Sequence, residues 1–132
     1  MSPSLVQGRK TGRQSRTLTF GEIALPAGQS VSQDQRVQRW YHNAVTSPDQ
    51  VRQRVAWALG QIVITSDRDD FLANEPIMVA EWNDIIVRNA LGNYRNLLQA
   101  ITLNVGMGYY LNTKGNLKEN TAGRQPDENY AR

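Results

Sequence analysis

The sequence of 132 residues contains no cysteine, a single histidine and no long apolar run. Without cysteine, disulfide scaffolds, thiolate metal sites and cysteine nucleophiles are excluded. No run approaches the roughly 18–20 apolar residues of a membrane span, and no apolar stretch follows the basic residues near the N-terminus, so the chain as written shows no signal peptide. His42 has no neighbour in sequence that would orient it for acid–base chemistry or join it on a metal ion, which favours a surface or structural role. We therefore expect neither a metal site nor a cofactor.

Charge is sparse and unevenly distributed. The formal net charge is +3, and the first sixteen residues hold four cations and no acid, namely Arg9, Lys10, Arg13 and Arg16. Such a tail is most often a solvated linker, and its alternative role is to bind an anionic partner. No nucleic-acid motif accompanies it. We predict a basic, largely disordered or extended arm over residues 1–30, in which residues 17–25 form either one short strand or an extended segment on the helices.

From residue 31 onwards, apolar residues recur at helical spacing. This pattern predicts the all-α class, as an irregular array of four to five helices. The first helix is expected over residues 33–45. The start of the second helix is indicated by Ser47 as N-cap, Pro48 in the first helical position and Gln50, which completes a capping box. This helix is expected to run to about residue 66.

The second predicted helix is apolar on two faces. Its main face carries Val51, Val55, Leu59, Ile62 and Val63, whereas Trp57 and Ile64 lie on the opposite side with Gln53 and Gln61. A helix that is apolar on two faces is normally buried between neighbours, so this one is predicted to be the central helix. All three tryptophans, Trp40, Trp57 and Trp82, fall on apolar faces and are expected in the core.

A third helix is predicted over residues 75–91, with Pro76 near its start and Gly92 ending it in a left-handed turn. Asn93 is expected to cap a fourth helix, and residues 105–111 form a short helical turn or apolar hook. Residues 112–125 read as a polar loop.

Pro126 is expected to open a last helix that is cut off at Arg132, because about seven residues cannot hold a helix alone. We therefore expect residues 31–132 to be the N-terminal part of a larger helical domain. The missing partner would be the C-terminal part of its own chain, and the chain alone would be poorly stable.

Two polar clusters are candidate sites. Asp67, Asp69 and Asp70 suggest either a cation site or, in better agreement with their spacing, a solvated loop that caps the next helix. At the start of the last predicted helix, Glu128 and Arg132 are candidate catalytic residues, and Asp127 and Asn129 are candidate ligand-binding residues. The alternative for this second group is a capping cluster with its own salt bridges.

Three segments resemble the bacterial domain-of-unknown-function 1800 family. They are residues 49–59 (DQVRQRVAWAL), residues 89–98 (NALGNYRNLL) followed by 107–111, and, most specifically, residues 123–132 (GRQPDENYAR). The resemblance implies a longer, mostly helical and often exported protein with no established activity. Many relatives carry Trp-His-Asn-His where this chain has residues 58–61 (ALGQ), so histidine-dependent chemistry is not expected within this chain.

Three hypotheses about function follow. The first is an uncharacterised, exported bacterial protein with an enzymatic site at residues 127–132. The second is a non-catalytic helical scaffold that binds another protein or a cell-surface polymer. The third, anion or nucleic-acid binding, would rest on the basic arm alone.

Overall fold

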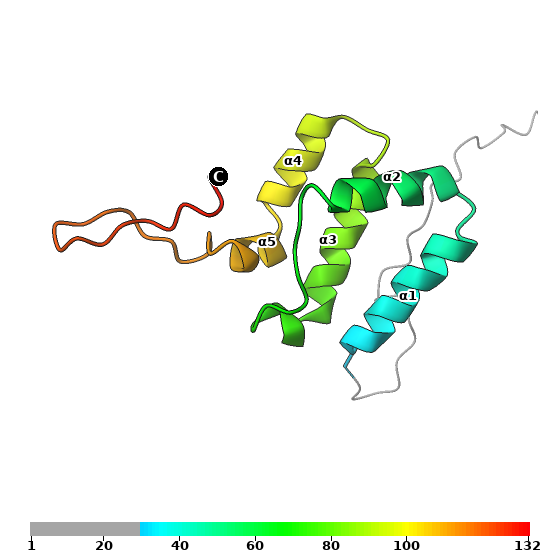
Figure 1. Ribbon diagram of the computed structural model, residues 1–132, viewed down its shortest axis with the longest axis horizontal. Helices are drawn as coiled ribbons and strands as arrows, with labels where there is room; N and C mark the ends of the chain where they lie inside the picture. Colours follow the sequence, from blue (N-terminus) through cyan, green and yellow to red (C-terminus); the bar gives the residue numbers. More distant parts are fainter. Residues whose placement is uncertain (1–29) are drawn as a thin grey trace, which may run out of the picture.

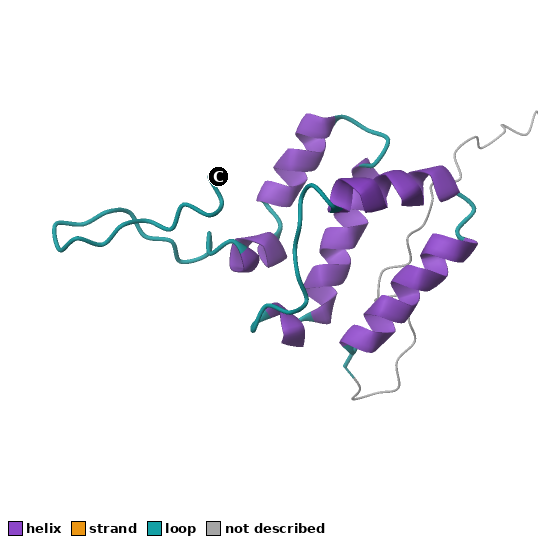
Figure 2. Ribbon diagram, viewed as in Figure 1, coloured by secondary structure: helices purple, strands orange, loops and turns teal. Residues whose placement is uncertain are grey.

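The computed structural model describes residues 30–132, and this part of the chain is helical. It contains five α-helices, one short 3₁₀ helix and no strand, which confirms the predicted all-α class (Figures 1 and 2). The elements are α1 (Gln33–Thr46), α2 (Gln50–Gly60), η2 (Leu72–Asn74), α3 (Pro76–Asn89), α4 (Tyr94–Thr102) and α5 (Val105–Tyr110). The predicted arm over residues 1–30, including the segment 17–25, lies outside the described residues except for Ser30.

The central helix is α3, which packs against α1, α2, η2, α4 and α5 (Figure 1). Its inward face carries Val79, Trp82 and Ile86, all of which are buried, and for Trp82 this confirms the predicted core position. The largest core cluster joins α3 to its neighbours through Ala56, Trp82, Ile86, Val87, Ala90, Leu97, Ile101 and Met107.

The prediction that the second helix is central is wrong. Ala56 is the only buried residue of α2, whereas Val51 and Trp57 are exposed. The periodicity correctly indicated two apolar faces, but periodicity does not report whether a second helix packs on each face. Among residues 30–132 no helix packs against the face that carries Trp57.

Helix α2 also ends at Gly60, earlier than the predicted residue 66. Glycine is a weak helix former, and residues 62–65 are four consecutive β-branched residues, Ile-Val-Ile-Thr, whose side chains are restricted in a helix. The chain therefore leaves the helix at Gln61, whose backbone N–H donates to the carbonyl of Ala58, while the N–H groups of Ile62 and Val63 donate to the carbonyl of Leu59.

The helix starts are partly as predicted. Asn93 caps α4 by accepting from the backbone N–H of Arg95, and Pro76 occupies the first turn of α3. The capping box expected at the second helix occurs instead at α1, between Ser32 and Gln35. Ser47 does not cap α2, because it is the C-cap of α1 and its hydroxyl donates to the carboxylate of Asp49, which is the N-cap of α2.

Gly92 does not adopt the predicted left-handed conformation. The only glycines with positive φ among residues 30–132 are Gly115 and Gly123, both in the C-terminal loop. Helix α3 ends without such a turn because Ala90 keeps right-handed helical angles and Gly92 donates its N–H to the carbonyl of Asn89.

The last helix predicted at Pro126 is also absent. Residues 112–132 form the predicted polar loop followed by further loop, which extends away from the helices (Figure 2). A single turn closes near the end, where Ala131 and Arg132 donate their N–H groups to the carbonyl of Glu128. The hydrogen bonds of one isolated turn do not compensate for the conformational entropy that is lost when a helix nucleates. These exposed residues also have no apolar face packed against the protein that would stabilise a longer helix.

Candidate functional site

The predicted polar cluster at residues 127–132 is organised around Asp127. Its carboxylate accepts hydrogen bonds from Asn112 Nδ2 at 2.9 Å and from the backbone N–H of Asn129 at 2.9 Å. Asn116 forms a reciprocal pair with the backbone of Asp127, through contacts of 2.6 and 3.0 Å. The hydrogen bonds from Asn129 and Asn112 lower the pKa of Asp127. These contacts tie the end of the chain to the start of the same loop.

The candidate catalytic pair, Glu128 and Arg132, forms an ion pair one turn apart. Both side chains are largely exposed, at 65% for Glu128 and 73% for Arg132. Tyr130, between them, donates its hydroxyl to Thr102 at the end of α4. The structure thus brings the four predicted residues into one turn, with Asp127 and Asn129 bonded to each other and Glu128 bonded to Arg132.

The acidic residues after α2 have structural partners. Asp69 Oδ1 accepts the backbone N–H groups of Phe71 and Leu72 at 3.0 and 3.1 Å, at the start of η2, whereas α3, the helix that this loop was expected to cap, has Glu75 as its N-cap and no side-chain cap. Asp67 forms an ion pair of 2.5 Å with Arg36 of α1. His42 is exposed on α1, where its Nδ1 lies 3.2 Å from the hydroxyl of Thr46.

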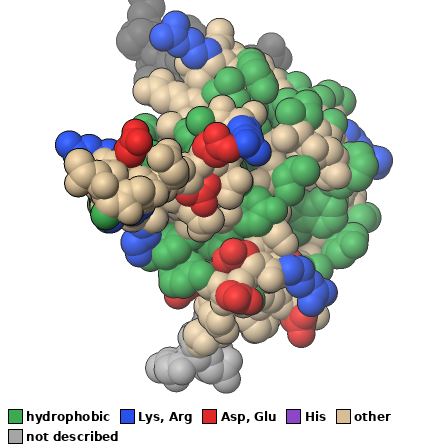
Figure 3. Space-filling model, turned by 60° about the vertical axis from the view of Figure 1, so that its left-hand side comes forward, with side chains coloured by type: hydrophobic (Ala, Val, Ile, Leu, Met, Phe, Trp, Pro, Cys, Tyr) green, Lys and Arg blue, Asp and Glu red, His purple; other side chains and the backbone are tan. Residues whose placement is uncertain are grey.

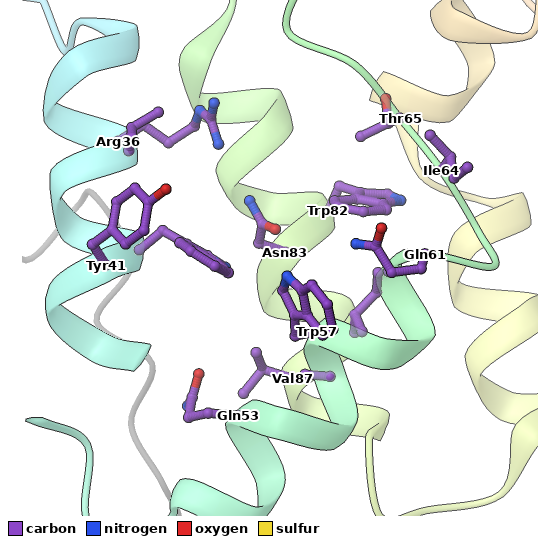
Figure 4. A pocket seen from close by; sticks show the side chains of 15 residues that line it. Arg36, Tyr41, Gln53, Trp57, Gln61, Ile64, Thr65, Trp82, Asn83 and Val87 are labelled. Carbon is purple, nitrogen blue, oxygen red and sulfur yellow. The ribbon is translucent and has the colours of Figure 1, made fainter. Parts of the chain in front are cut away.

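A cleft that the sequence did not predict opens between α1, α2 and α3 (Figure 4). Its volume is about 350 Å³, within the range of small-molecule sites. Its walls combine aromatic rings with amide side chains. Those from α1 and α2 include Trp40, Tyr41, Gln53 and Trp57, and those from α3 and the segment after α2 include Trp82, Asn83, Gln61 and Thr65.

Trp57 lines this cleft with an exposed side chain. It was expected in the core, but its side chain is 56% exposed. It rises from α2 beside Asn83 of α3, with Tyr41 of α1 on the other side of the cleft (Figure 4). Trp40 packs edge-to-face on Tyr41, with ring centroids 4.9 Å apart, and so supports that wall. Of the three tryptophans, Trp82 is buried as predicted and Trp40 is half-buried.

A second hollow adjoins the first and has a volume of about 340 Å³. The two hollows share four lining residues, Trp40, Tyr41, Gln53 and Trp57, and the second continues along Ala44, Val45 and Arg54. The two hollows together run along the surface between α1 and α2, and we refer to them as the aromatic groove.

The first hollow carries little free charge. Arg36 is its one charged lining residue, and its guanidinium is paired with Asp67 at 2.5 Å. Burial lowers the pKa of Arg36, and the nearby Asp67 carboxylate acts against that shift. An ion pair in the wall leaves the hollow close to neutral.

Two polar groups of residues that line the first hollow have no hydrogen-bond partner among the described residues. They are the indole N–H of Trp82 and the hydroxyl of Thr65, and both are buried. Trp82 itself is only 8% exposed. A buried donor without a partner costs about 1–3 kcal/mol, so a ligand group that reached these two atoms after a side-chain movement would gain by bonding to them.

One sequence signal could have located this groove. Trp57 and Ile64 share one side of the α2 segment with the amides Gln53 and Gln61, and a face that mixes an aromatic ring with amides is poorly suited to a dry core. We interpreted that face as buried because nothing in the pattern showed that no helix covers it.

Comparison with known proteins agrees with the resemblance of the three segments. The sequence model of one family, described as "Protein of unknown function (DUF1800)", matches residues 7–132. Neither the curated proteins nor the solved structures contain a significant match. Among residues 30–132 no helix is long and apolar enough to cross a membrane, and no group of three or more His, Cys, Asp or Glu side chains is arranged to hold a metal ion.

Proposed function

We propose a function from the geometry alone, because this chain belongs to the family described as "Protein of unknown function (DUF1800)", and membership brings no activity with it. The proposed function is that of a non-catalytic helical scaffold that binds another macromolecule, a protein or a cell-surface polymer, in the aromatic groove. The export that the family resemblance implies would bring the groove into contact with such partners.

The observation that carries this proposal is the exposure of Trp57. A tryptophan side chain that is more than half open to solvent loses most of the free energy that its burial would contribute to folding. Tryptophan and tyrosine are also the residues enriched where protein surfaces bind partners, because they offer a large rigid area at low entropic cost. Here Trp57 faces Tyr41 across the cleft, and both residues line both hollows.

The proposal is tested with three purified proteins: the unaltered chain, Trp57→Ala and Tyr94→Ala. Tyr94 is the matched control, because this aromatic residue on α4 is 52% exposed but does not line the groove. Each protein is incubated with insoluble bacterial cell-wall polymer and, separately, with immobilised envelope proteins. We expect one of the two to retain the unaltered chain and Tyr94→Ala, and to retain Trp57→Ala about tenfold less well.

Retention of Trp57→Ala at the level of the unaltered chain would overturn the proposal, and so would the absence of retention on both materials. Circular dichroism of the three proteins confirms that the substitutions leave the helices intact. Because Trp57 is largely exposed, its replacement is expected to change stability little.

A second candidate function is enzymatic and belongs to residues 127–132. It is favoured by the exposed pairing of Glu128 with Arg132, which holds an acid and a guanidinium side by side at the surface. Such a pair could bind a polar substrate and transfer a proton to or from it. Removal of residues 113–132 tests this candidate, because it deletes the cluster and leaves the aromatic groove in place.

A further inference from the structure

Resting on the proposed function, we infer that the aromatic groove binds a neutral oligosaccharide of β-linked pyranose rings whose hydroxyl groups are equatorial. Such a ring has two different kinds of surface. Its faces carry C–H groups and are apolar, whereas its edge carries hydroxyl groups that donate and accept hydrogen bonds. The groove offers a matching combination of flat aromatic surface and polar side chains.

The apolar face of a sugar ring would stack on Trp57. Its indole is the largest exposed ring in the groove and stands at the boundary between the two hollows. Flat aromatic rings bind the C–H faces of equatorial pyranoses well, because no axial hydroxyl group holds the two surfaces apart. Tyr41 faces the first hollow from α1 and limits its width (Figure 4).

The polar edge of the ring would meet side chains that lack partners. The side-chain amide of Gln61 and the hydroxyl of Tyr41 line the first hollow and make no hydrogen bond within residues 30–132. Trp82 and Thr65 also line this hollow, and the indole N–H of the one and the hydroxyl of the other are buried without partners among the described residues. In Figure 4 the amide of Gln61 lies between Trp57 and Trp82, so its movement would admit a ligand hydroxyl to this end of the hollow.

The charge of the first hollow argues for a neutral ligand. Its lining includes no acid, and its one cation, Arg36, is held by Asp67. An acidic polymer would need unpaired cations at regular spacing, whereas Arg54 is the single such group, at the edge of the second hollow. An amphipathic protein helix would in turn require a continuous apolar floor, which the amides of Gln53, Gln61 and Asn83 interrupt.

The length of the groove argues for several sugar rings. Two hollows of about 350 and 340 Å³ adjoin at Trp57, so one ring on each side of the indole would occupy them in succession. Repeating units of a polymer fit this arrangement, because each ring presents the same apolar face and polar edge.

The test is a titration of the full 132-residue chain with cellohexaose and with chitohexaose, followed by tryptophan fluorescence and calorimetry. We expect saturable binding of at least one of them. Trp57→Ala should weaken it at least about tenfold, Trp57→Phe should weaken it less, and Tyr94→Ala should leave it unchanged. An acidic sugar with the same β-linked equatorial rings, a cellohexaose oxidised to the uronic acid at C6, should bind no more tightly than the neutral sugars.

Three results would overturn the inference: no binding of either neutral sugar at millimolar concentration, equal binding by Trp57→Ala, or preferential binding of the acidic sugar. If the immobilised envelope proteins nevertheless retain the chain through Trp57, the groove binds a protein, and the scaffold function stands without the saccharide. If neither the sugars nor the envelope materials bind, both proposals fail.

Discussion

At the scale of single residues, the ion pair between Arg36 and Asp67 joins two segments that are distant in sequence. Arg36 is buried on α1, and its Nε also donates to Gln33, whose amide contacts the carbonyls of Leu72 and Ala73. The pair thus fixes α1 against the connection between α2 and α3. It also neutralises the only charge in the wall of the first hollow.

Replacing Asp67 with asparagine is expected to lower the free energy of unfolding by about 1–3 kcal/mol. The substitution leaves the buried guanidinium without a counter-charge, and the loss lies below the roughly 3–5 kcal/mol of fully buried pairs because the Asp67 side chain is 32% exposed. Urea unfolding followed by circular dichroism measures it. Asp70→Asn is the control, since Asp70 is an exposed acid of the same loop, and an equal loss in both variants would contradict the assigned role of the ion pair.

At the scale of helices, the fold depends on α3 far more than on α2. Helix α3 supplies Trp82, Ile86 and Val87 to the core, and its last carbonyls at Val87 and Arg88 accept hydrogen bonds from Arg52 of α2. Helix α2 contributes one buried residue, Ala56. Apolar side chains in α3 therefore contribute more to stability than those in α2.

A matched pair of substitutions tests this contrast. Ile86→Ala is expected to cost about 2–5 kcal/mol, because Ile86 is 2% exposed and its removal leaves a cavity among α2, α3 and α4. Ile62→Ala, at a position that is 67% exposed just after α2, is expected to cost less than about 0.5 kcal/mol. Equal costs in thermal or urea unfolding would show that the segment around α2 is packed as tightly as α3.

The contrast also shows what the sequence could predict. Local rules placed the helices correctly where a cap or a proline acts on its own neighbours, as at Asn93 and Pro76. They failed where two elements compete for one residue, as at Ser47, which ends α1 instead of starting α2. They also failed for Trp57, because the exposure of a helix face depends on whether another helix lies against it.

The polar cluster illustrates the same limit. The sequence placed Asp127, Glu128, Asn129 and Arg132 on a helix, where their side chains would point in different directions. In the loop that forms instead, Asn112 and Asn116 come from more than ten residues away to bind Asp127. Such distant partners leave no signal in local periodicity, so the sequence could indicate that these residues lie close together but not which contacts they make, and their role as a site stays a prediction.

At the scale of the whole molecule, the two candidate sites lie on different parts of the chain. The aromatic groove lies among α1, α2 and α3, whereas residues 112–132 extend beyond α5 on the opposite side (Figure 1). The surface turned toward the C-terminal loop carries broad hydrophobic areas with scattered charged side chains (Figure 3). One small ligand cannot reach the groove and the polar cluster together, so the two proposals are separable.

A chain that ends at Asn112 separates them. Residues 113–132 supply no member of the core cluster, and they meet the helices through peripheral contacts such as Tyr130 with Thr102 and Lys114 with Tyr109. Their deletion is therefore expected to lower the unfolding midpoint by no more than about 4–8 °C, the shift that about 1 kcal/mol produces in a domain of this size.

The shortened chain should bind the ligand of the aromatic groove with unchanged affinity, because every residue that lines the two hollows precedes Asn112. Glu128→Gln in the full chain is the companion variant, since it removes the exposed acid without shortening the loop. Binding that survives both changes but fails in Trp57→Ala assigns the function to the groove. If instead both changes abolish a measured activity while the helices stay folded, the polar cluster carries the function. The reason is that Glu128→Gln breaks the ion pair with Arg132 and leaves the groove unchanged.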